Sequence, residues 1–293
     1  MKRVILHSDM NACYASIEAK LNPSLKGIPM AVAGNPKNRH GIILAKSEEA
    51  KKMGVKTGEP IWQAQAKCPN IKLVPPHYEE YLKHSKMARA IYYEYTNQVE
   101  PFGLDECYLD VTGSIHFFGS GKMIAEKIRK RMKEELGITV SIGVSFCKIF
   151  AKLGSDMKKP DAITIIDEND YKEKTWPLGV REMLGIGKAT EAKLQKIGIY
   201  NIGDLANAPV ETLKSLLGIN GVYLWQYANG LDIRPVVDRD HKEPIKSIGN
   251  SSTCKRDLYK SKEVFNVLQE LSFSVSKRLR EAELEALGVE VYV

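Results

Sequence analysis

The 293-residue sequence contains no apolar run of the roughly 18 residues that a membrane-spanning helix requires. Near the amino terminus, the apolar stretch at residues 4–6 ends at His7. That is too early for an export signal, whose hydrophobic region has about 7 residues or more. These two absences predict a cytoplasmic protein without a membrane partner.

Cysteine is scarce, and its arrangement excludes two kinds of small scaffold. The five cysteines are odd in number and widely spaced, and they include no CxxC pair. This pattern argues against a disulfide framework and against a structural zinc site. We expect reduced, mostly packed thiols at Cys13, Cys68, Cys107, Cys147 and Cys254.

Neither sign of charge is in large excess. The chain has 43 Lys and Arg against 36 Asp and Glu, a formal net charge of +7. Such a charge permits a polyanionic partner but does not require one. With 43% hydrophobic residues, the composition is that of a globular protein long enough for two or more domains.

The first 166 residues alternate between strand-like and helix-like patterns. Strands are expected at residues 3–8, 29–33, 42–45, 106–111, 139–144 and 162–166, and helices at 12–20, 48–53, 78–95, 122–136 and 146–153. A polar loop is expected at residues 34–41. The alternation lacks regular βαβ units, which favours an α+β fold over a doubly wound sheet.

The pattern changes after residue 168. Glycines divide residues 177–230 into helix-sized pieces, and residues 235–244 are charged and poor in apolar side chains, as in an interdomain linker. A last block predicts a strand at 246–253, a helix at 262–280 and a strand at 288–293. Two strands and one helix bury little apolar surface, so we expect this last domain to be incomplete.

Acidic residues stand at the ends of two predicted strands. Asp9 follows the first strand, and Asp105 and Glu106 enter a later one. Carboxylates placed in this way can face a shared cleft and bind Mg²⁺. Two ions about 4 Å apart can activate a hydroxyl and neutralise a leaving pyrophosphate. Taken alone, however, a strand-end Asp is more often a turn residue, and an Asp-Glu pair more often faces solvent.

Six motifs in a fixed order make a metal-binding role of these acidic residues the favoured interpretation. They occupy residues 9–18, 41–46, 54–60, 100–112, 141–145 and 151–160. The series resembles the Y-family DNA polymerases, particularly the DNA polymerase IV branch, over essentially the whole chain. The most specific parts are Asp-Glu-Cys-Tyr-Leu-Asp at 105–110 and Ala-Lys-Leu-Gly-Ser-Asp-Met-Lys-Lys-Pro at 151–160.

The resemblance implies an α+β, right-hand polymerase. The palm would span residues 1–10 and 77–166, the small fingers 11–76, the helical thumb 167–233, the linker 234–245 and a partial little finger 246–293. The implied activity is low-fidelity, translesion DNA synthesis that adds dNTPs to a primer 3′ end. We expect a monomer that binds primer–template DNA and uses two Mg²⁺ ions, for which Mn²⁺ can substitute. A sliding clamp stays an open partner, because no clamp-binding tail is seen.

The resemblance also implies roles for single residues around the reaction. Asp9, Asp105 and Glu106 match the metal-binding carboxylates, and the backbone carbonyl of Met10 would complete one site. Tyr14 matches the sugar gate, an aromatic ring that leaves no room for a 2′-hydroxyl. It could otherwise be an ordinary core aromatic.

Basic residues of two regions are implied to bind the triphosphate. Lys159 matches the family lysine that approaches it as a flexible point charge. The polymerase IV branch usually has Thr, Tyr and Arg where this chain has Ala45, Glu48 and Lys51. This stretch is more similar to the UmuC-type branch, so we expect Lys46 and Lys51 to bind phosphate. Lys148 and Lys152 share a helical face, where they could assist or be solvated.

Residues 184–199 read as a helix-hairpin-helix of the thumb. Glycines allow backbone N–H groups to approach a phosphate at a helix N-terminus. We therefore expect Gly185, Gly187 and Lys188 to contact the DNA backbone, with residues 217–221 as a poorer second copy. Trp225 and Tyr227 are expected in the thumb core.

Two other readings stay open. A catalytically weakened DNA-binding or regulatory protein on a polymerase fold would explain Ala45 and Glu48, although its carboxylates are intact. A nucleotide cyclase on a similar palm would leave the thumb hairpin without a role. Primer extension with Mg²⁺ and dNTPs separates all three.

Overall fold

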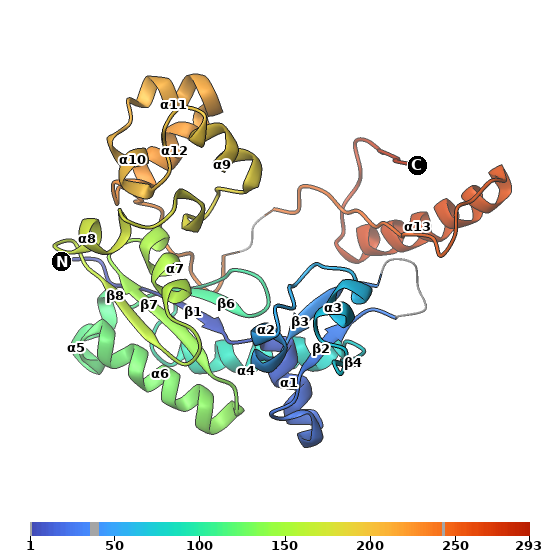
Figure 1. Ribbon diagram of the computed structural model, residues 1–293, viewed down its shortest axis with the longest axis horizontal. Coiled ribbons are helices and arrows are strands. Elements are labelled where there is room, and N and C mark those ends of the chain that lie inside the picture. The colour runs from blue at the N-terminus through green and yellow to red at the C-terminus, as the bar shows by residue number, and fades with distance from the viewer. Residues whose placement is uncertain (1, 36–40, 242–243) are drawn as a thin grey trace.

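The computed structural model describes residues 2–35, 41–241 and 244–293. Most of the polar loop expected at 34–41, and residues 242 and 243 of the expected linker, lie outside the described residues. Helices and sheets are mixed as predicted for an α+β fold. The strands form a five-stranded and a three-stranded sheet. Figure 1 shows the units built on these two sheets side by side, a helical unit above, and a C-terminal helix set apart.

The five-stranded sheet has the order β5-β6-β1-β7-β8. Its strands are β1 (Ile5–Met10), β5 (Val99–Pro101), β6 (Glu106–Asp110), β7 (Val140–Ser145) and β8 (Ile163–Ile166). The central strand β1 runs antiparallel to β6 and β7, and β7 runs parallel to β8. Every residue of β1 and β7 is buried. The end of β1 is therefore enclosed between segments far away in the sequence.

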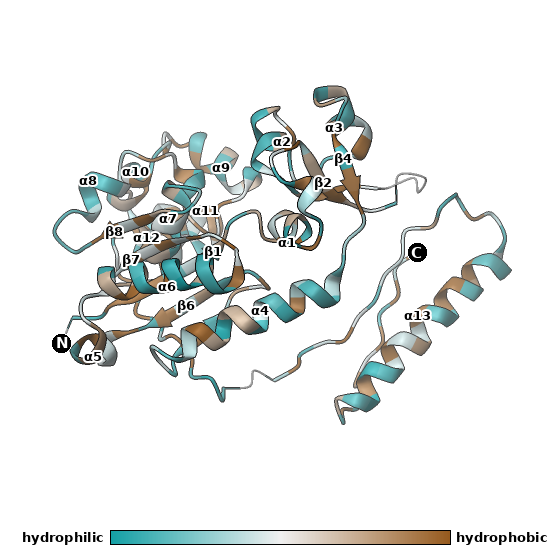
Figure 2. Ribbon diagram, turned by 90° about the horizontal axis from the view of Figure 1, so that it is seen from below, coloured by the Kyte–Doolittle hydropathy of each residue, from teal (hydrophilic) through white to brown (hydrophobic). Residues whose placement is uncertain are grey.

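Helices cover both faces of this sheet. Leu6 packs in the core that includes α4 (Tyr78–Tyr93) and α6 (Gly121–Leu136), whereas Ile5 packs with Ala151 of α7 (Lys148–Met157). Successive side chains of a strand point to opposite faces, so α7 lies opposite α4 and α6. Figure 2 shows α4 and α6 together on the near side of the strands. The odd-numbered residues of β1 consequently face α7.

Helix α6 shows how its sequence determines its bounds. Ser120 caps the first turn by accepting from the N–H of Met123, and Gly137 ends the helix in a left-handed conformation. Between them, apolar side chains recur at helical spacing and are buried, namely Ile124, Ile128, Met132 and Leu136. The charged residues of α6 lie on its other side, as the amphipathic pattern predicted.

The three-stranded sheet has the order β3-β2-β4. Its strands are β2 (Met30–Ala33), β3 (Ile43–Lys46) and β4 (Lys72–Val74), and its helices are α1 (Cys13–Leu21), η1 (Pro23–Leu25), α2 (Glu48–Lys52) and α3 (Ile61–Lys67). It has its own core, with Ile43, Val55 and Ile61 among the buried residues. Of these elements, α3 and β4 were missed in the sequence, as was β5 in the larger sheet.

The helical unit rests on α7. Its elements are α8 (Tyr171–Thr175), η3 (Val180–Glu182), α9 (Lys188–Gln195), α10 (Ile202–Asn207), α11 (Val210–Leu217) and α12 (Ile219–Ala228). The core of this unit includes Ile149, Phe150 and Leu153 of α7, and Trp225 and Tyr227 pack against it as predicted. Helix α7 is therefore shared between the sheet and the helical unit.

Two short helices, η2 (Thr112–Ser114) and α5 (Ile115–Phe118), precede α6.

The expected linker begins with a docked segment. Val236 is buried, and Val237 donates its N–H to Glu100 at 3.1 Å. Lys148 pairs with Glu100 at 2.5 Å and donates to the carbonyl of Pro235 at 3.3 Å. Residues 235–237, which composition predicts to begin a solvated linker, are therefore held against the five-stranded unit through their backbone and the buried Val236.

The C-terminal segment corrects two expectations. Helix α13 (Ser261–Glu281) forms as predicted, but the strands expected at 246–253 and 288–293 are wrong, since neither segment is a strand. Neither pairs with another described segment, and extended chain without a partner leaves its backbone groups to water. No helix among the described residues is long and apolar enough to cross a membrane.

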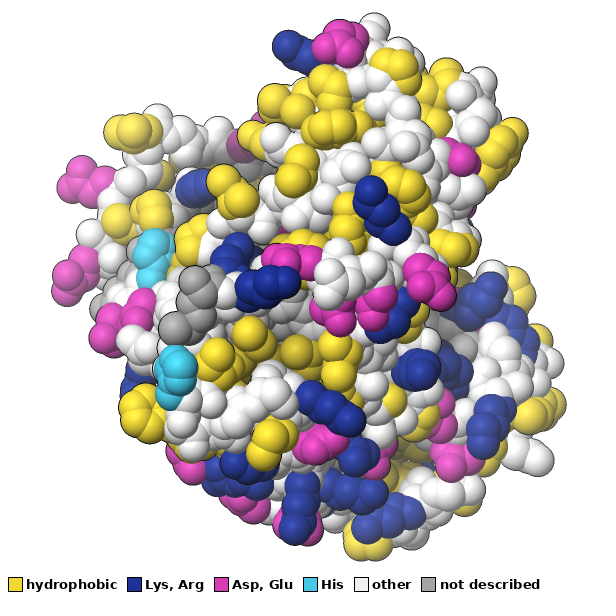
Figure 3. All heavy atoms as spheres, turned by 90° about the vertical axis from the view of Figure 1, so that its left-hand side faces the viewer, with side chains coloured by type: hydrophobic (Ala, Val, Ile, Leu, Met, Phe, Trp, Pro, Cys, Tyr) yellow, Lys and Arg dark blue, Asp and Glu magenta, His cyan; other side chains and the backbone are white. Residues whose placement is uncertain are grey.

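The five cysteines are free, and four of them are buried, as expected. Figure 3 shows one face of the molecule, where Lys and Arg side chains gather over the lower, sheet-bearing part and are interleaved with Asp and Glu. Hydrophobic side chains are prominent over the helical unit above. This face agrees with the modest net charge of the sequence.

Candidate active site

Strand pairing brings the predicted carboxylates together. In the ladder between β1 and β6, Asp9 lies directly opposite Glu106. The N–H of Met10 donates to the carbonyl of Asp105 at 3.0 Å. Directly opposite residues of an antiparallel pair have Cα atoms about 4.5–5.5 Å apart. Two motifs far apart in the sequence therefore meet at one end of the sheet.

A pocket of about 440 Å³ opens at this end of the sheet. Its far wall comes from β3, α2 and the loop that contains Thr57. The pocket is lined by all the residues predicted for metal, sugar or triphosphate binding, namely Asp9, Met10, Tyr14, Lys46, Lys51, Asp105, Glu106 and Lys159. The fold thus brings the sheet and the three-stranded unit to one site.

Asp9 is buried but still lines the pocket, with 6% of its surface exposed. Its Oδ2 accepts from Lys159 Nζ at 2.6 Å and lies 3.6 Å from Lys152 Nζ. Burial raises the pKa of Asp9 to about 6, although the charge of Lys159 opposes this shift. The carboxylate is therefore salt-bridged, but it is not sealed off from the pocket.

The other two carboxylates have different surroundings. Burial would raise the pKa of Glu106, but the contact with His7 and the charge of Lys152 outweigh it and lower the pKa to about 2. Burial, helped by the charge of Glu106, raises the pKa of Asp105. Lys152 Nζ lies 3.1 Å from Glu106, which explains why Glu106 stays ionised most readily.

Two lysines balance these carboxylates. Lys159 bridges Asp9 and Asp156, the latter at 2.8 Å, and Lys152 lies 3.0 Å from Asp156. Burial would lower the pKa of each lysine, but Asp9 for Lys159 and Glu106 for Lys152 outweigh it and raise the pKa. Both ammonium groups are therefore charged at neutral pH.

The positions of the three carboxylates determine whether a divalent ion can bind in this pocket. Among the residues that the structure describes, no group of three or more His, Cys, Asp and Glu side chains forms a ready metal cage. The donor chemistry nevertheless fits a hard divalent ion, because three carboxylates converge on a pocket and Mg²⁺ takes few protein carboxylates beside water and phosphate oxygens. An ion would compete with the ammonium groups of Lys152 and Lys159.

Tyr14 projects from α1 into the same pocket. Its ring stacks on that of Tyr81, with centroids 4.1 Å apart and planes 9° apart. The Tyr81 hydroxyl donates to the buried carboxylate of Glu18, which His77 also contacts at 2.9 Å. The position of the Tyr14 ring is therefore supported from α4, by residues that no motif in the sequence indicated.

The far wall carries the predicted phosphate-binding lysines. Lys46 donates to Thr57 at 3.1 Å, and burial, with the charge of Lys51, lowers the pKa of Lys46. Lys51 lies 3.5 Å from Glu48, so this carboxylate is paired with a basic residue of the same wall. The acidic charge of Glu48 is thereby offset locally.

Lys148 and Lys152, whose roles the sequence left open, have different partners. Lys152 is in the pocket's charge network, whereas Lys148 pairs with Glu100 beside the docked linker. Asn11 was not singled out, yet its Oδ1 accepts from the N–H of Asp161 at 2.9 Å and so anchors the segment after Lys159. An Asn next to a strand end carries no signal of that contact in the sequence.

Comparisons with known proteins agree with this geometry. The model of the impB/mucB/samB family matches residues 8–156, that of the DNA polymerase-iota thumb domain matches 181–232, and that of the impB/mucB/samB family C-terminal domain matches 245–293. DNA polymerase IV of Acetivibrio thermocellus is 52% identical over 293 residues, covering 100% of this chain and 73% of the relative. DNA polymerase IV 1 of Bacillus subtilis is 44% identical over 284 residues, covering 97% and 68%.

Solved structures give the same answer. A Y-family DNA polymerase chimera of Dbh and Dpo4 has a TM-score of 0.84 at 26% identity, covering 94% of this chain and 80% of that one. DinB from Sulfolobus solfataricus has a TM-score of 0.74 at 29% identity, covering 80% and 69%. The chain belongs to the Y family of DNA polymerases.

In this Y-family polymerase, the predicted DNA-backbone contacts lie in the helical unit. Gly185, Gly187 and Lys188 are exposed around the buried Ile186, and Gly187 precedes α9 without a side-chain cap. Exposed residues at a helix N-terminus are open to a phosphate, so the contact with the DNA backbone stays a prediction. In the proposed second copy, Gly221 instead packs against α11, because a Cβ there would lie 2.2 Å from the carbonyl oxygen of Leu213.

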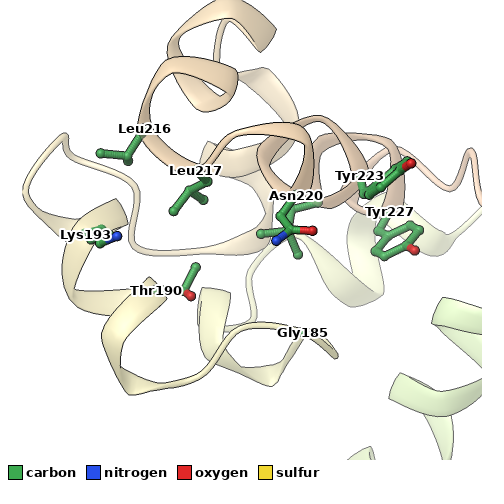
Figure 4. Close-up of a pocket in the computed structure, with 9 residues that line it drawn as sticks. Gly185, Thr190, Lys193, Leu216, Leu217, Asn220, Tyr223 and Tyr227 are labelled. Carbon is green, nitrogen blue, oxygen red and sulfur yellow. The ribbon is translucent and has the colours of Figure 1, made fainter. Parts of the chain in front are cut away.

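A second pocket, of about 460 Å³, lies within the helical unit (Figure 4). It is lined by Gly185, Thr190, Lys193, Leu216, Leu217, Asn220, Tyr223, Leu224 and Tyr227. This lining contains one basic and no acidic side chain, so it offers no carboxylate to a divalent ion. Of these two pockets, the one at the end of β1 has the carboxylates that a divalent ion needs.

Proposed function

We propose that this Y-family enzyme carries out translesion DNA synthesis in the pocket at the end of β1, where it adds dNTPs to a primer 3′ end. The observation that supports this site is the pairing of Asp9 with Glu106, next to Asp105, in a chain whose relatives are named DNA polymerase IV. A catalytically weakened regulatory protein is not favoured, because the relatives are polymerases. A cyclase would leave the helical unit without a role.

The units can be assigned to the parts of a right hand. We infer that the five-stranded unit is the palm (1–10 and 77–166), the three-stranded unit the fingers (11–76), and the helical unit the thumb (167–233). Residues 234–245 then link to the little finger (246–293). The three-stranded unit has a small core of its own, and the helical unit gathers its buried residues in a second core that it shares with α7, which supports the assignment.

The proposed cofactor is a pair of Mg²⁺ ions, which would acidify the primer hydroxyl and neutralise the pyrophosphate when bound. Asp9, Asp105 and Glu106, with the carbonyl of Met10, would hold them. Lys159 has a flexible stem and can leave Asp9 for the triphosphate while Asp156 remains within its reach. Lys46 and Lys51 would contact phosphate from the far wall.

Sugar selection is assigned to Tyr14. The stacked Tyr81 supports its ring from one side, so the ring cannot retreat to admit a 2′-hydroxyl without losing that contact. The DNA partner would be held through the backbone at Gly185, Gly187 and Lys188, which positions the duplex without reading its sequence.

Primer extension tests the proposed metal site. Asp9→Ala and Asp105→Ala should abolish Mg²⁺-dependent incorporation of dNTPs while leaving primer–template affinity largely intact, since neither is a predicted DNA contact. Asp240→Ala, which removes an exposed Asp outside the pocket, is the matched control and should extend normally. Extension by Asp9→Ala at the wild-type rate would refute the assignment.

A further inference from the structure

His7 is a buried polar residue for which the proposed reaction has no role so far. It lies on β1 two residues before Asp9, so both side chains face α7. In the ladder it sits opposite Tyr108 of β6 and Gly143 of β7, and its side chain is fully buried. A fully buried imidazole carries polar nitrogens that need partners.

Each ring nitrogen faces one polar atom. Nδ1 lies 2.8 Å from the hydroxyl of Ser155, and Nε2 lies 3.2 Å from Oε2 of Glu106. The ring packs edge-on against Tyr108, with centroids 4.6 Å apart, and this contact restricts its rotation. The ring thus spans the space between α7 and the proposed metal ligand Glu106.

The pair formed by Nε2 and Oε2 is unsatisfied as placed. Both atoms are inaccessible to solvent, and neither makes a hydrogen bond of normal geometry with any described residue, although Lys152 Nζ lies 3.1 Å from Oε2 as an ion-pair partner. Lys152 offsets the charge of Oε2 but does not satisfy Nε2, and an unprotonated Nε2 would face a second acceptor 3.2 Å away in a buried site, at a cost comparable to a lost hydrogen bond. A proton on Nε2 removes that repulsion and supplies the missing donor.

Ser155 is compatible with this arrangement. Its hydroxyl is 2.7 Å from the carbonyl of Lys152 and 2.8 Å from Nδ1 of His7, so its single proton can be directed to either. When it is directed to Nδ1, the neutral ring carries its proton on Nε2. Ser155 of α7 then determines which nitrogen of His7 carries the proton.

We propose that His7 is a positioning residue that donates its Nε2–H to Oε2 of Glu106 and so holds this carboxylate in the orientation that binds the divalent ion. The inference rests on the proposed function, because it takes Glu106 as a metal ligand. Outer-shell partners of this kind typically change metal affinity by about 10- to 100-fold when removed. His7 contacts neither substrate nor metal in this scheme.

Two substitutions separate the two ring nitrogens. In His7→Gln the amide nitrogen reaches about as far as Nε2, whereas in His7→Asn it reaches only about as far as Nδ1. Mn²⁺ affinity is measured on the ternary complex with a dideoxy-terminated primer, where no bond can form. We expect His7→Asn to bind Mn²⁺ about 10- to 100-fold more weakly than the wild type, and His7→Gln to regain most of the affinity.

A second measurement needs no variant. Nitrogen NMR of the metal-free wild-type protein, labelled at histidine, should show that Nε2 of His7 carries a proton. A proton on Nδ1 alone would overturn the inference, as would equal Mn²⁺ affinities of the Asn and Gln variants. Wild-type protein without metal-dependent extension would instead overturn the proposed function, so the two failures are distinguishable.

Discussion

At the scale of single residues, the pocket shifts two neighbouring carboxylates in opposite directions. Asp9 and Glu106 are paired across the ladder, yet burial raises the pKa of Asp9 to about 6, and His7 and Lys152 overcome burial to lower that of Glu106 to about 2. The two pKa values differ because the two carboxylates have different charged and hydrogen-bonding partners. Ionised Asp9 therefore costs stability in the metal-free protein, as is common for groups kept for function.

That cost predicts a pH dependence. The unfolded chain loses the Asp9 proton near pH 4 and the folded chain near pH 6, so folding is destabilised progressively as pH rises through this window, by up to about 3 kcal/mol. Asp9→Asn removes the charge. Without divalent ions, it should be more stable than the wild type at pH 7 and no more stable near pH 4. Urea unfolding at both pH values measures this, and an advantage that does not grow with pH would contradict it.

The support behind Tyr14 makes a second prediction at this scale. Tyr14→Ala should incorporate ribonucleotides far more readily, because it lacks the ring that we propose excludes the 2′-hydroxyl. Tyr81→Phe keeps the stacked ring and loses only the hydrogen bond to Glu18, so it should change sugar discrimination less. The ratio of dNTP to rNTP incorporation measures both effects. Unchanged discrimination in Tyr14→Ala would remove the gate assignment.

At the scale of elements, α7 connects the site to the rest of the protein. It carries Lys152 and Ser155 toward the carboxylates, and Ile149 and Phe150 into the core of the helical unit. It approaches β7 so closely that Gly143 has no space for a side chain, since a Cβ there would lie 1.9 Å from the carbonyl oxygen of Ala151. The position of α7 therefore depends on one missing methyl group.

Gly143→Ala should consequently displace α7. We expect it to destabilise the protein by about 1–3 kcal/mol, the usual cost of overpacking, and to impair primer extension because Lys152 and Ser155 move with the helix. Gly179→Ala is the matched control, since nothing lies within 4 Å of its Cβ position and its φ of −55° suits alanine. Urea unfolding compares the two. A loss of stability no larger in Gly143→Ala than in the control would contradict the prediction.

At the scale of the whole molecule, the segment after the helical unit is held against the five-stranded unit. Lys148 and Glu100 form its anchor, through the carbonyl of Pro235 and the N–H of Val237. Arg3 adds a hydrogen bond to the carbonyl of Arg234 at 2.8 Å. The path of the chain toward its C-terminal segment is therefore determined at the five-stranded unit.

Removing the anchor should free that segment. Glu100→Ala deletes both of its contacts and leaves the buried Lys148 without its carboxylate. Amide hydrogen exchange should become faster at residues 234–239 and stay slow in β7. Glu94→Ala is the control. It also breaks an ion pair, the 2.7 Å contact between Glu94 and Arg131, but this pair lies at the surface and includes no residue of 234–239. Unchanged exchange at 234–239 would show that the anchor contributes little.

Much of this architecture is predictable from the sequence because it depends on local patterns. Periodic apolar residues, Ser120 and Gly137 determine where α6 begins and ends. The ordered motifs, matched with the family, predicted the α+β fold and a pocket-lining set from Asp9 to Lys159. Short elements such as α3 and β4 were missed, since a few residues carry too little periodicity to distinguish helix from strand.

Tertiary structure decided what depends on partners far along the chain. Lys148 and Lys152 look alike in the sequence, yet one anchors the linker and the other neutralises Glu106. The strands expected at 246–253 and 288–293 are coil because no described segment pairs with them. The pKa values of Asp9 and Glu106 diverge for the same reason. Burial and electrostatic fields come from side chains that only folding brings within a few ångströms, so no local pattern encodes them.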